Sequence, residues 1–382
     1  MTPFGTTLTF LLCIAVLLAA GCEDAIHSHS QDIVIVKLNH DGSTAWIKTV
    51  DSGKNYVMND ALQTSDGGYA LEGISSTPLC NPQCKGYENW TPTILRLSTT
   101  GELISEWRFP SELKEKPGQY LPMGLVQTPD NVFYTVSDTG IILFIDQKGT
   151  ITGSRPLDPN LQKDNIHSFI RTRDGGSAII GRAFIEKLDP NGTTTWTRDY
   201  SAMGFSTVDQ ITELNNDRGY ASVMTSNSNN SVVVIDNNGS IVNSSLISLD
   251  SYQYYLQTEP KGFSVFGDQI INSTYPVYYY DNEGIRTDET ARNFTYDPHT
   301  TIVTSDPGYV SVSKTGVYFG VPKAATNISA QKLNRSGEVE WDHPITSFNT
   351  DIYSIHIRNT LETSDRGYII VLGIENSGSL YK

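Results

Sequence analysis

Short apolar runs separated by polar turns extend along most of the chain. Uninterrupted examples are residues 33–36, 141–145 and 232–235. No segment places apolar residues at positions i, i+3, i+4 and i+7 over three helical turns, so the pattern predicts an all-β protein. A strand with one solvated face alternates apolar and polar residues, whereas continuous runs indicate strands that are buried on both faces.

The phrase Thr-x-Asp-x-Gly-aromatic recurs between these runs. Some copies depart from it, since Val132 replaces the glycine in one copy and Ser177 replaces the aromatic residue in another. Asp side chains bond to the backbone of tight turns and glycine adopts positive φ, so each copy predicts the turn of a β-hairpin. The seven copies lie at residues 64–69, 128–133, 172–177, 217–220, 258–263, 304–309 and 363–368.

A second phrase alternates with the first: an apolar run, a polar turn that ends in glycine, and a further strand. Residues 189–192, Asp-Pro-Asn-Gly, have the composition of a short hairpin turn. A tryptophan follows the glycine by four residues in three copies, as Trp46, Trp196 and Trp341. The seven glycines are Gly42, Gly101, Gly149, Gly192, Gly239, Gly284 and Gly337.

Two kinds of hairpin in strict alternation predict seven units of four antiparallel strands. Small sheets packed radially around an axis bury both faces of each sheet and leave only short edges. The sequence therefore predicts a seven-bladed β-propeller over residues 33–382. A straight solenoid would bury similar surfaces, but it would need distinct end caps, and the sequence shows none.

The order of the hairpins predicts how the ring closes. The Gly-Trp type comes first, at residues 33–50, and the Thr-x-Asp type comes last, at residues 352–373. If the Thr-x-Asp hairpin supplies the two inner strands of each blade, these two segments share one blade. We therefore expect the N-terminal strands to pair with the C-terminal hairpin, which would leave no exposed inner edge.

The two repeated phrases resemble those of PQQ-like and related propeller lipoproteins of unassigned function in bacteria and archaea. The resemblance covers nearly all of residues 33–382. It implies the propeller architecture, and it implies no reaction because both phrases are packing and turn signatures. No cofactor is expected, since a quinone-dependent dehydrogenase would commonly carry adjacent cysteines and this chain has none.

A 13-residue apolar run, residues 8–20, lies near the N-terminus. It is shorter than the ~20 residues of a membrane-spanning helix and suits a signal peptide. Residues 19–22, Ala-Ala-Gly-Cys, resemble the lipobox of prokaryotic lipoproteins. The resemblance implies a signal peptide over residues 1–21, acylation of Cys22 and a tether over residues 22–32. The alternatives are an ordinary secretory signal and a buried N-terminal helix.

The chain of 382 residues has 42 acidic and 27 basic side chains, a net charge of −15 and no basic cluster. Nucleic acid is therefore not an expected partner, because phosphate binding depends on patches of Lys and Arg. The apolar content of 38% argues against disorder. We expect an exported protein, anchored by lipid on the extracytoplasmic side of a membrane, at the cell surface or in the periplasm, with an envelope protein or glycan as its partner.

Residues 74–91 form an insertion between two hairpins. Cys80 and Cys84 lie within it, and we expect them to form a disulfide in an exported protein. A free or metal-bound pair is the alternative, although no second Cys or His pair has zinc-site spacing. Tyr87 and Trp90 are candidate ligand contacts, because a long loop that carries aromatic residues suits a contact surface. Otherwise the loop folds over one end of the ring.

No catalytic constellation or metal site is predicted from the sequence. The recurring aspartates could be read as calcium ligands, but their turns lack the ligand spacing of a calcium loop, so turn stabilisation is expected. A site assembled at the axis from distant blades would escape such a search. Nine Asn-x-Ser/Thr sequons mark positions where a glycan would be tolerated: Asn89, Asn191, Asn229, Asn238, Asn243, Asn272, Asn293, Asn327 and Asn334.

The leading prediction is a membrane-anchored propeller that binds or scaffolds a protein or a glycan through one face. One alternative is an extracellular polysaccharide hydrolase or lyase with a site at the axis, and another is an envelope assembly lipoprotein. A deep axial pocket with converging carboxylates would favour the enzyme. A flat face with an exposed aromatic patch would favour the binding module.

Overall fold

The computed structural model describes most of the chain between residues 31 and 376. No helix in this part of the chain is long and apolar enough to cross a membrane. The described residues are 31–50, 53–76, 90–109, 122–158, 166, 168–215, 218–226, 229–247, 254–259, 261–267, 275–287, 292–294, 300–306, 308–315, 326–334, 338–348 and 352–376.

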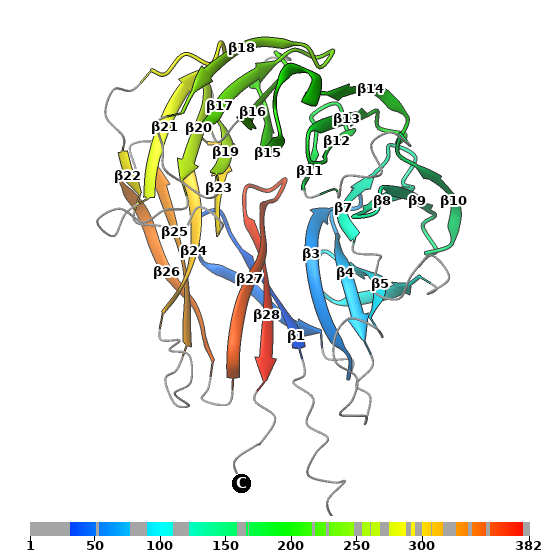
Figure 1. Ribbon diagram of the computed structural model, residues 1–382. Helices are drawn as coiled ribbons and strands as arrows, with labels where there is room; N and C mark the ends of the chain where they lie inside the picture. The colour runs from blue at the N-terminus through cyan, green and yellow to red at the C-terminus, as the bar shows by residue number, and fades with distance from the viewer. Residues whose placement is uncertain are drawn as a thin grey trace, which may run out of the picture.

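Within these ranges, 28 strands form seven antiparallel four-stranded sheets arranged around an axis (Figure 1). The predicted seven-bladed all-β propeller is therefore confirmed. Blades I to III contain β3 (Asn55–Gln63), β4 (Tyr69–Ser76), β5 (Thr91–Leu97), β6 (Leu103–Arg108); β7 (Pro122–Gln127), β8 (Phe133–Ser137), β9 (Ile141–Ile145), β10 (Ile151–Pro156); and β11 (Ser168–Arg171), β12 (Ser177–Ile180), β13 (Phe184–Leu188), β14 (Thr194–Asp199).

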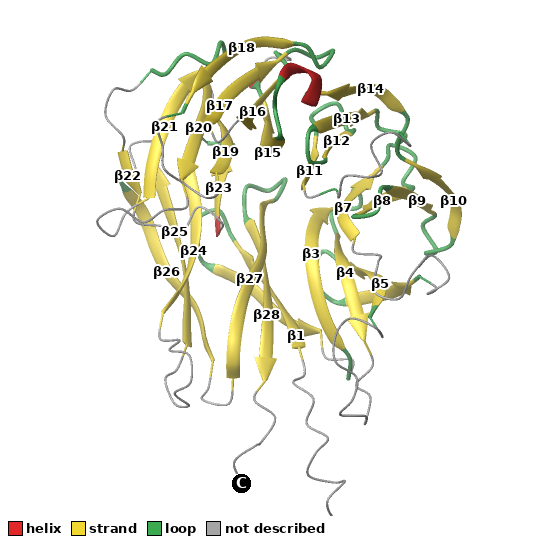
Figure 2. Cartoon of the chain, in the orientation of Figure 1, coloured by secondary structure: helices red, strands yellow, loops and turns green. Residues whose placement is uncertain are grey.

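The remaining blades follow in chain order, except that the last takes strands from both ends of the chain. Blades IV to VII contain β15 (Thr207–Glu213), β16 (Tyr220–Ser226), β17 (Asn229–Ile235), β18 (Ile241–Leu246); β19 (Tyr254–Glu259), β20 (Gly262–Gly267), β21 (Tyr275–Asp281), β22 (Arg292–Phe294); β23 (Thr301–Thr304), β24 (Gly308–Thr315), β25 (Thr326–Asn334), β26 (Val339–Phe348); and β27 (Ile352–Glu362), β28 (Tyr368–Asn376), β1 (Gln31–Leu38), β2 (Thr44–Val50). Where the connections between these strands are described, Figure 2 shows loops and short helical turns.

Burial of the strands depends on their distance from the axis. The first strands of adjacent blades, such as β3 and β7, contact each other and surround the axis. Second and third strands such as β8 and β13 are buried along their whole length, as the continuous apolar runs predict. Fourth strands such as β18 expose every second residue. The Thr-x-Asp hairpins are thus the inner halves of the blades.

Blade VII joins the two ends of the described chain. β1 lies between β2 and β28, and its pairing with β28 extends from Gln31 opposite Glu375 to Leu38 opposite Tyr368. Buried β1 residues such as Ile35 and Val36 pack into two different apolar clusters, one on each face of the sheet. Hydrogen bonds and apolar packing between distant parts of the sequence therefore close the ring.

The repeated aspartate stabilises its own turn and also binds a basic residue of the same blade. In blade III, Asp174 accepts hydrogen bonds from the Thr172 hydroxyl (2.5 Å) and the Gly176 N–H (3.0 Å). Its second oxygen lies 2.7 Å from the ammonium of Lys187, a third-strand residue. Corresponding ion pairs join Asp66 to Arg96, Asp306 to Lys332 and Asp365 to Lys37. These contacts support the turn role, and no group of three metal-binding side chains occurs in the described ranges.

In four blades the glycine of the second phrase packs against a tryptophan of the preceding blade. At Gly149, φ is +83°, and an added Cβ would lie 2.3 Å from the Trp107 ring. Gly101 meets Trp46 in the same way, at 2.6 Å. The indole and the turn therefore fit together only when the turn residue has no side chain, which connects the outer halves of adjacent blades.

Candidate binding site between blades IV, V and VI

The contact residues predicted from the sequence are mostly outside the described part of the chain. This applies to Cys22, Cys80, Cys84 and Tyr87, and so to the lipid anchor and the disulfide. Trp90 is described, and it lies partly buried directly before β5.

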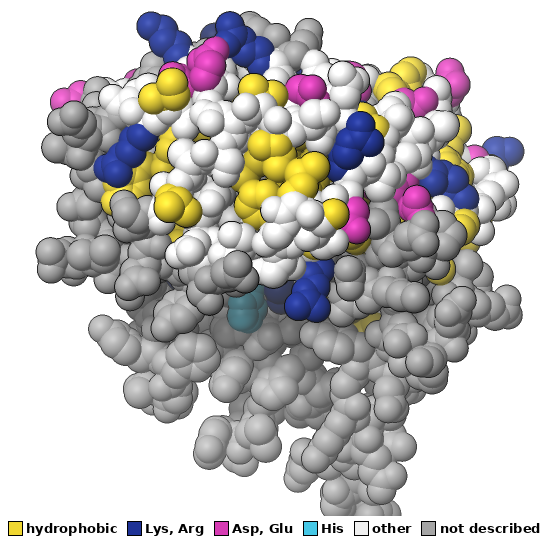
Figure 3. Space-filling model, turned by 45° about the horizontal axis from the view of Figure 1, so that its top comes forward, with side chains coloured by type: hydrophobic (Ala, Val, Ile, Leu, Met, Phe, Trp, Pro, Cys, Tyr) yellow, Lys and Arg dark blue, Asp and Glu magenta, His cyan; other side chains and the backbone are white. Residues whose placement is uncertain are grey.

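Exposed large apolar side chains in the described ranges are aliphatic residues and one methionine, with Val242 and Leu246 of β18 among them. Figure 3 shows one face of the molecule, on which basic and acidic side chains are interspersed with apolar groups. The aromatic contact surface considered above therefore has no counterpart among the described exposed residues.

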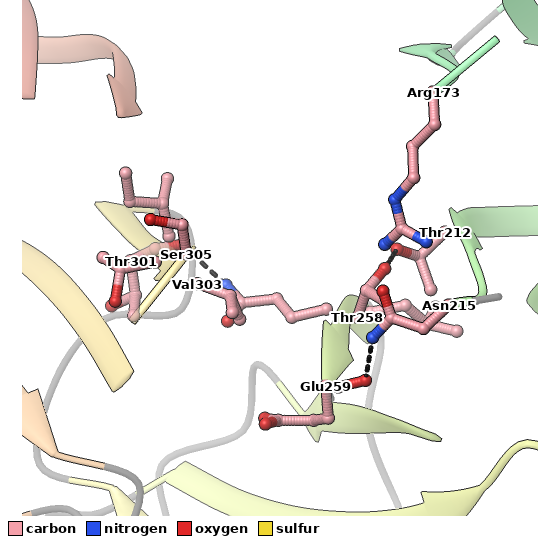
Figure 4. Close-up of a pocket in the computed structure, with 12 residues that line it drawn as sticks. Arg173, Thr212, Asn215, Thr258, Glu259, Thr301, Val303 and Ser305 are labelled. Atoms are coloured by element: carbon pink, nitrogen blue, oxygen red, sulfur yellow. Dashed lines mark hydrogen bonds between the residues drawn. The ribbon is translucent and has the colours of Figure 1, made fainter. Parts of the chain in front are cut away.

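A cavity of about 700 Å³ lies where the first strands of blades IV, V and VI meet (Figure 4). Its walls come from β15, β19 and β23 and the turns that follow them, and Arg173 reaches it from the turn of blade III. The lining residues are Arg173, Thr212, Asn215, Leu256, Gln257, Thr258, Glu259, Thr301, Ile302, Val303, Thr304 and Ser305. Most of these side chains are hydroxyls or amides, and a few are aliphatic.

Blade V departs from the repeat that the sequence predicts. In blade I, the Thr64 N–H donates to the Gly68 carbonyl (2.9 Å) and closes the turn, whereas in blade V it is Glu259 that pairs with Gly262. Thr258 therefore occupies the position of Gln63, and Glu259 occupies the position of the repeated threonine. The alignment of residues 258–263 with the other copies is wrong by one position because this turn is one residue shorter. Thr258 consequently lines the cavity.

Neighbouring blades are joined beside the Thr-x-Asp turns by a repeated hydrogen bond, which we call the latch. A carboxylate or amide oxygen at the end of a first strand accepts the backbone N–H of a turn residue in the preceding blade. The four latches pair Gln127 with Ser65 (2.7 Å), Glu213 with Arg173 (2.7 Å), Glu362 with Ser305 (2.7 Å) and Gln63 with Ser364 (2.8 Å). These turns therefore share one face of the ring, the turn face.

At two interfaces the strand-end residue offers no side-chain acceptor, because it is Arg171 or Val303. The sequence carries Pro129 and Pro260 at the corresponding turn positions, and proline has no backbone N–H. At each of these two interfaces the backbone N–H donor and the side-chain acceptor of the latch are both absent, so neither is present without the other. The cavity lies at the second of these interfaces, between blades V and VI.

The Thr212 hydroxyl of blade IV and the Thr258 hydroxyl of blade V form a hydrogen bond whose donor can be identified. Thr258 Oγ1 donates to the Glu213 carbonyl at 2.5 Å and lies 2.7 Å from Thr212 Oγ1. Because a hydroxyl has one hydrogen, Thr212 must donate to Thr258. The Thr212 oxygen therefore has only acceptor capacity left for the cavity.

Gln257 provides a second acceptor. Its Nε2 donates to the Thr301 carbonyl at 2.6 Å, which connects blades V and VI. Its Oε1 is buried and has no hydrogen-bond partner among the described residues. A buried carbonyl oxygen without a partner costs about 1–3 kcal/mol, so a hydrogen-bond donor that reaches Gln257 Oε1 would stabilise it.

Glu259 serves the interface between blades more than the cavity. Its carboxylate accepts hydrogen bonds from the Tyr309 hydroxyl and from Ser264 Oγ (3.1 Å), and it points away from Arg173 (Figure 4). Burial and the neighbouring Glu259 charge raise the pKa of Tyr309, so the phenol remains a donor. Glycoside hydrolysis by the usual mechanism needs two carboxyl groups at the reacting bond, and the described lining supplies this one alone.

Arg173 brings the only basic side chain to the described lining. Its Nη1 donates to the Leu214 carbonyl at 3.0 Å, and no ion pair within 4.0 Å joins it to another described residue. Glu213 binds its backbone N–H; burial raises the pKa of Glu213, and the Arg173 charge acts in the opposite direction. In Figure 4 the guanidinium points toward Thr212 and Thr258.

A second buried polar cluster lies between blades I, II and III. The Asp60 carboxylate accepts two bonds from Arg171 Nη1 and Nη2 (2.8 and 2.9 Å) and one from the Leu125 N–H (2.9 Å). Glu72 is 1% exposed nearby, and neither of its carboxyl oxygens has a hydrogen-bond partner in the described structure. Burial, with a smaller contribution from the Asp60 charge, raises the pKa of Glu72 well above its ordinary value. Sequence reasoning did not identify this cluster.

No protein-family model and no curated protein matches the sequence. Solved structures that are similar include a streptogramin B lyase (TM-score 0.48, 13% identity, 89% of this chain and 97% of that chain covered). Two more are the Dos1 propeller (0.47, 12%, 84% and 93%) and BamB from Moraxella catarrhalis (0.42, 14%, 90% and 91%).

Proposed function

We propose that the protein is an extracytoplasmic binding module that takes a saccharide into the cavity between blades IV, V and VI. The observation that carries this proposal is the lining, in which hydroxyl and amide side chains predominate. Saccharide hydroxyls donate and accept hydrogen bonds, and each needs a nearby polar partner when it leaves water. The aliphatic side chains of Leu256, Ile302 and Val303 supply contacts for the apolar faces of a sugar ring.

The size of the cavity favours a small ligand or the end of a chain over a folded protein. Ligand pockets typically have volumes of about 300–1,000 Å³. A stable protein–protein interface buries about 1,200–2,000 Å² of mostly flat surface. A cavity of about 700 Å³ belongs to the first class.

The location of the module rests on the sequence features of the N-terminus. The apolar run at residues 8–20 and the lipobox-like residues 19–22 support export and acylation at Cys22. Two or more acyl chains hold a protein stably at a membrane, whereas one chain does so only marginally. Fractionation of producing cells tests this part: the Cys22→Ala chain should be found in the soluble fraction and the wild type with the membranes. Equal distribution of the two would refute the anchor.

Binding to the cavity is tested by calorimetric titration of the full chain with a panel of neutral and acidic oligosaccharides of two to four units. We expect at least one to bind, and Thr212→Val to weaken its binding about 2- to 12-fold, the equivalent of about 0.5–1.5 kcal/mol for one neutral hydrogen bond. Thr152→Val makes the same change on the exposed strand β10, away from the cavity, and should leave the affinity unchanged.

Two results would refute the proposal. One is that no oligosaccharide of the panel binds. The other is that the Thr212 and Thr152 variants lose affinity equally, because the bound sugar would then lie elsewhere.

A further inference from the structure

We propose that the saccharide is acidic, and that Arg173 binds the carboxylate of a uronic acid residue within it. This inference rests on the proposed function and adds the class of ligand. Its basis is the distribution of charge and of hydrogen-bonding capacity over the cavity wall.

Few groups on the cavity wall are charged. Within the described lining, only Arg173 and Glu259 carry formal charges, and the Glu259 carboxylate is already bonded to Tyr309 and Ser264. Of the five N–H donors of the Arg173 guanidinium, a single one has an assigned acceptor, the Leu214 carbonyl. The remaining donors form a planar fork, whose geometry matches a carboxylate.

Other groups on the cavity wall need hydrogen-bond donors from a ligand. Thr212 Oγ1 and Gln257 Oε1 can only accept hydrogen bonds from a ligand, because the Thr212 hydrogen is already donated to Thr258 and an amide oxygen has no hydrogen to donate. A ligand that satisfies both walls must carry hydroxyl donors together with an anionic group. Uronic acids have both on one ring, whereas a neutral sugar would leave the guanidinium without an anionic partner.

The net charge of the whole protein also affects the binding of an anionic ligand. The net charge of −15 opposes an anion at long range, but physiological salt screens interactions between exposed charges beyond about 8 Å. Of the nearby acidic side chains, Asp174 pairs with Lys187, and the Glu213 carboxylate accepts the Arg173 backbone N–H. Arg173 is the one basic side chain of the described lining, so it is the group there that can pair with an anion.

A pair of ligands with the same hydroxyls, one with free carboxylates and one with neutral methyl esters, tests the inference. Calorimetric titration of the full chain with trigalacturonate and with its fully methyl-esterified form compares the same hydroxyls with and without carboxylates. We expect the acid to bind about tenfold more tightly than the ester, or more, and this preference to fall with added salt. Arg173→Gln should abolish the preference, and Arg173→Lys should keep part of it.

Arg218→Gln is the matched control, because it removes an equal charge from an exposed residue of blade IV that pairs with Glu283. This variant should retain the wild-type preference. Equal affinity of the wild type for acid and ester, or an undiminished preference in Arg173→Gln, would overturn the inference while leaving saccharide binding in place. Failure of every oligosaccharide to bind would instead overturn the proposed function, and the inference with it.

Discussion

Glu72 should make the protein less stable as the pH rises, and Glu72→Gln should remove this dependence. The residue is on β4, in the core between blades I and II, with no hydrogen-bond partner for either carboxyl oxygen among the described residues. Burial, and then the Asp60 charge, raise its pKa, while the Arg171 charge acts in the opposite direction. The net shift keeps the folded protein protonated at pH values where the unfolded chain is ionised.

The sign and size of the effect follow from proton linkage. Above a pH of about 4.5, the unfolded chain has released the Glu72 proton and the folded chain retains it, so the free energy of unfolding falls as the pH rises. The slope reaches at most about 1.4 kcal/mol per pH unit and ends at the pKa of the folded state. Glutamine has nearly the same shape and does not titrate. Its buried amide adds a cost of about 1–3 kcal/mol that does not depend on pH.

The measurement is urea unfolding, followed by tryptophan fluorescence, at pH values from 4.5 to 8. We expect the unfolding midpoint of Glu72→Gln to rise relative to the wild type as the pH increases, whatever its offset at the acidic end. Glu102→Gln is the control, because Glu102 is an exposed partner of Lys48; exposed ion pairs contribute about 0–1 kcal/mol, so its profile should follow the wild type. Parallel profiles for wild type and Glu72→Gln would refute the reasoning.

Three further predictions concern the closure of the ring and the repeated turns. Ile35→Ala, in the fully buried part of β1, should lower the free energy of unfolding by about 2–5 kcal/mol in urea titration, and Ile47→Ala, on exposed β2, by far less. Gly149→Ala should lower the thermal midpoint well beyond Gly53→Ala, because both glycines have positive φ but only at Gly149 would the new Cβ meet a ring; equal shifts would contradict the packing argument. Burial raises the pKa of Asp365, but the hydrogen bonds from Lys37 and from its own turn outweigh the effect of burial and bring the pKa to about 2. Its stabilising contribution is present above pH 4 and lost as the pH falls through 2, so Lys37→Met should flatten acid unfolding in this window, and an unchanged acid limb would exclude this role.

The blades could be predicted from the sequence because each hairpin phrase is local. A turn that needs Asp and Gly, between apolar runs, specifies two strands wherever it occurs, and seven copies specify the ring. The sequence also has a basic residue five positions before the glycine of the second phrase in four blades. These pairs are Lys37 and Gly42, Arg96 and Gly101, Lys187 and Gly192, and Lys332 and Gly337. The spacing follows from the ion pair with the repeated aspartate across each hairpin.

The cavity could not be predicted in this way because four different blades contribute to it. No spacing within one repeat relates Arg173 to Gln257 or Thr301, since the first strands meet only when the ring has formed. The role of Thr258 could not be predicted either, because the shorter turn of blade V makes a sequence alignment match it with the repeated threonine. The prolines at two of the interfaces without a latch are a local trace in the sequence, and their role becomes clear only once the latches are known.

The pairing of β1 with β28 determines where anything joined to the described chain must leave it. Gln31 lies opposite Glu375, at the end of blade VII remote from its Thr-x-Asp turn, whereas the cavity lies at the turn face. A fusion partner or a solid support joined directly at Gln31 or Asn376 would therefore lie on the side of the ring opposite the cavity. Immobilised molecules would all present the cavity outward, open to polymers too large to pass beneath them.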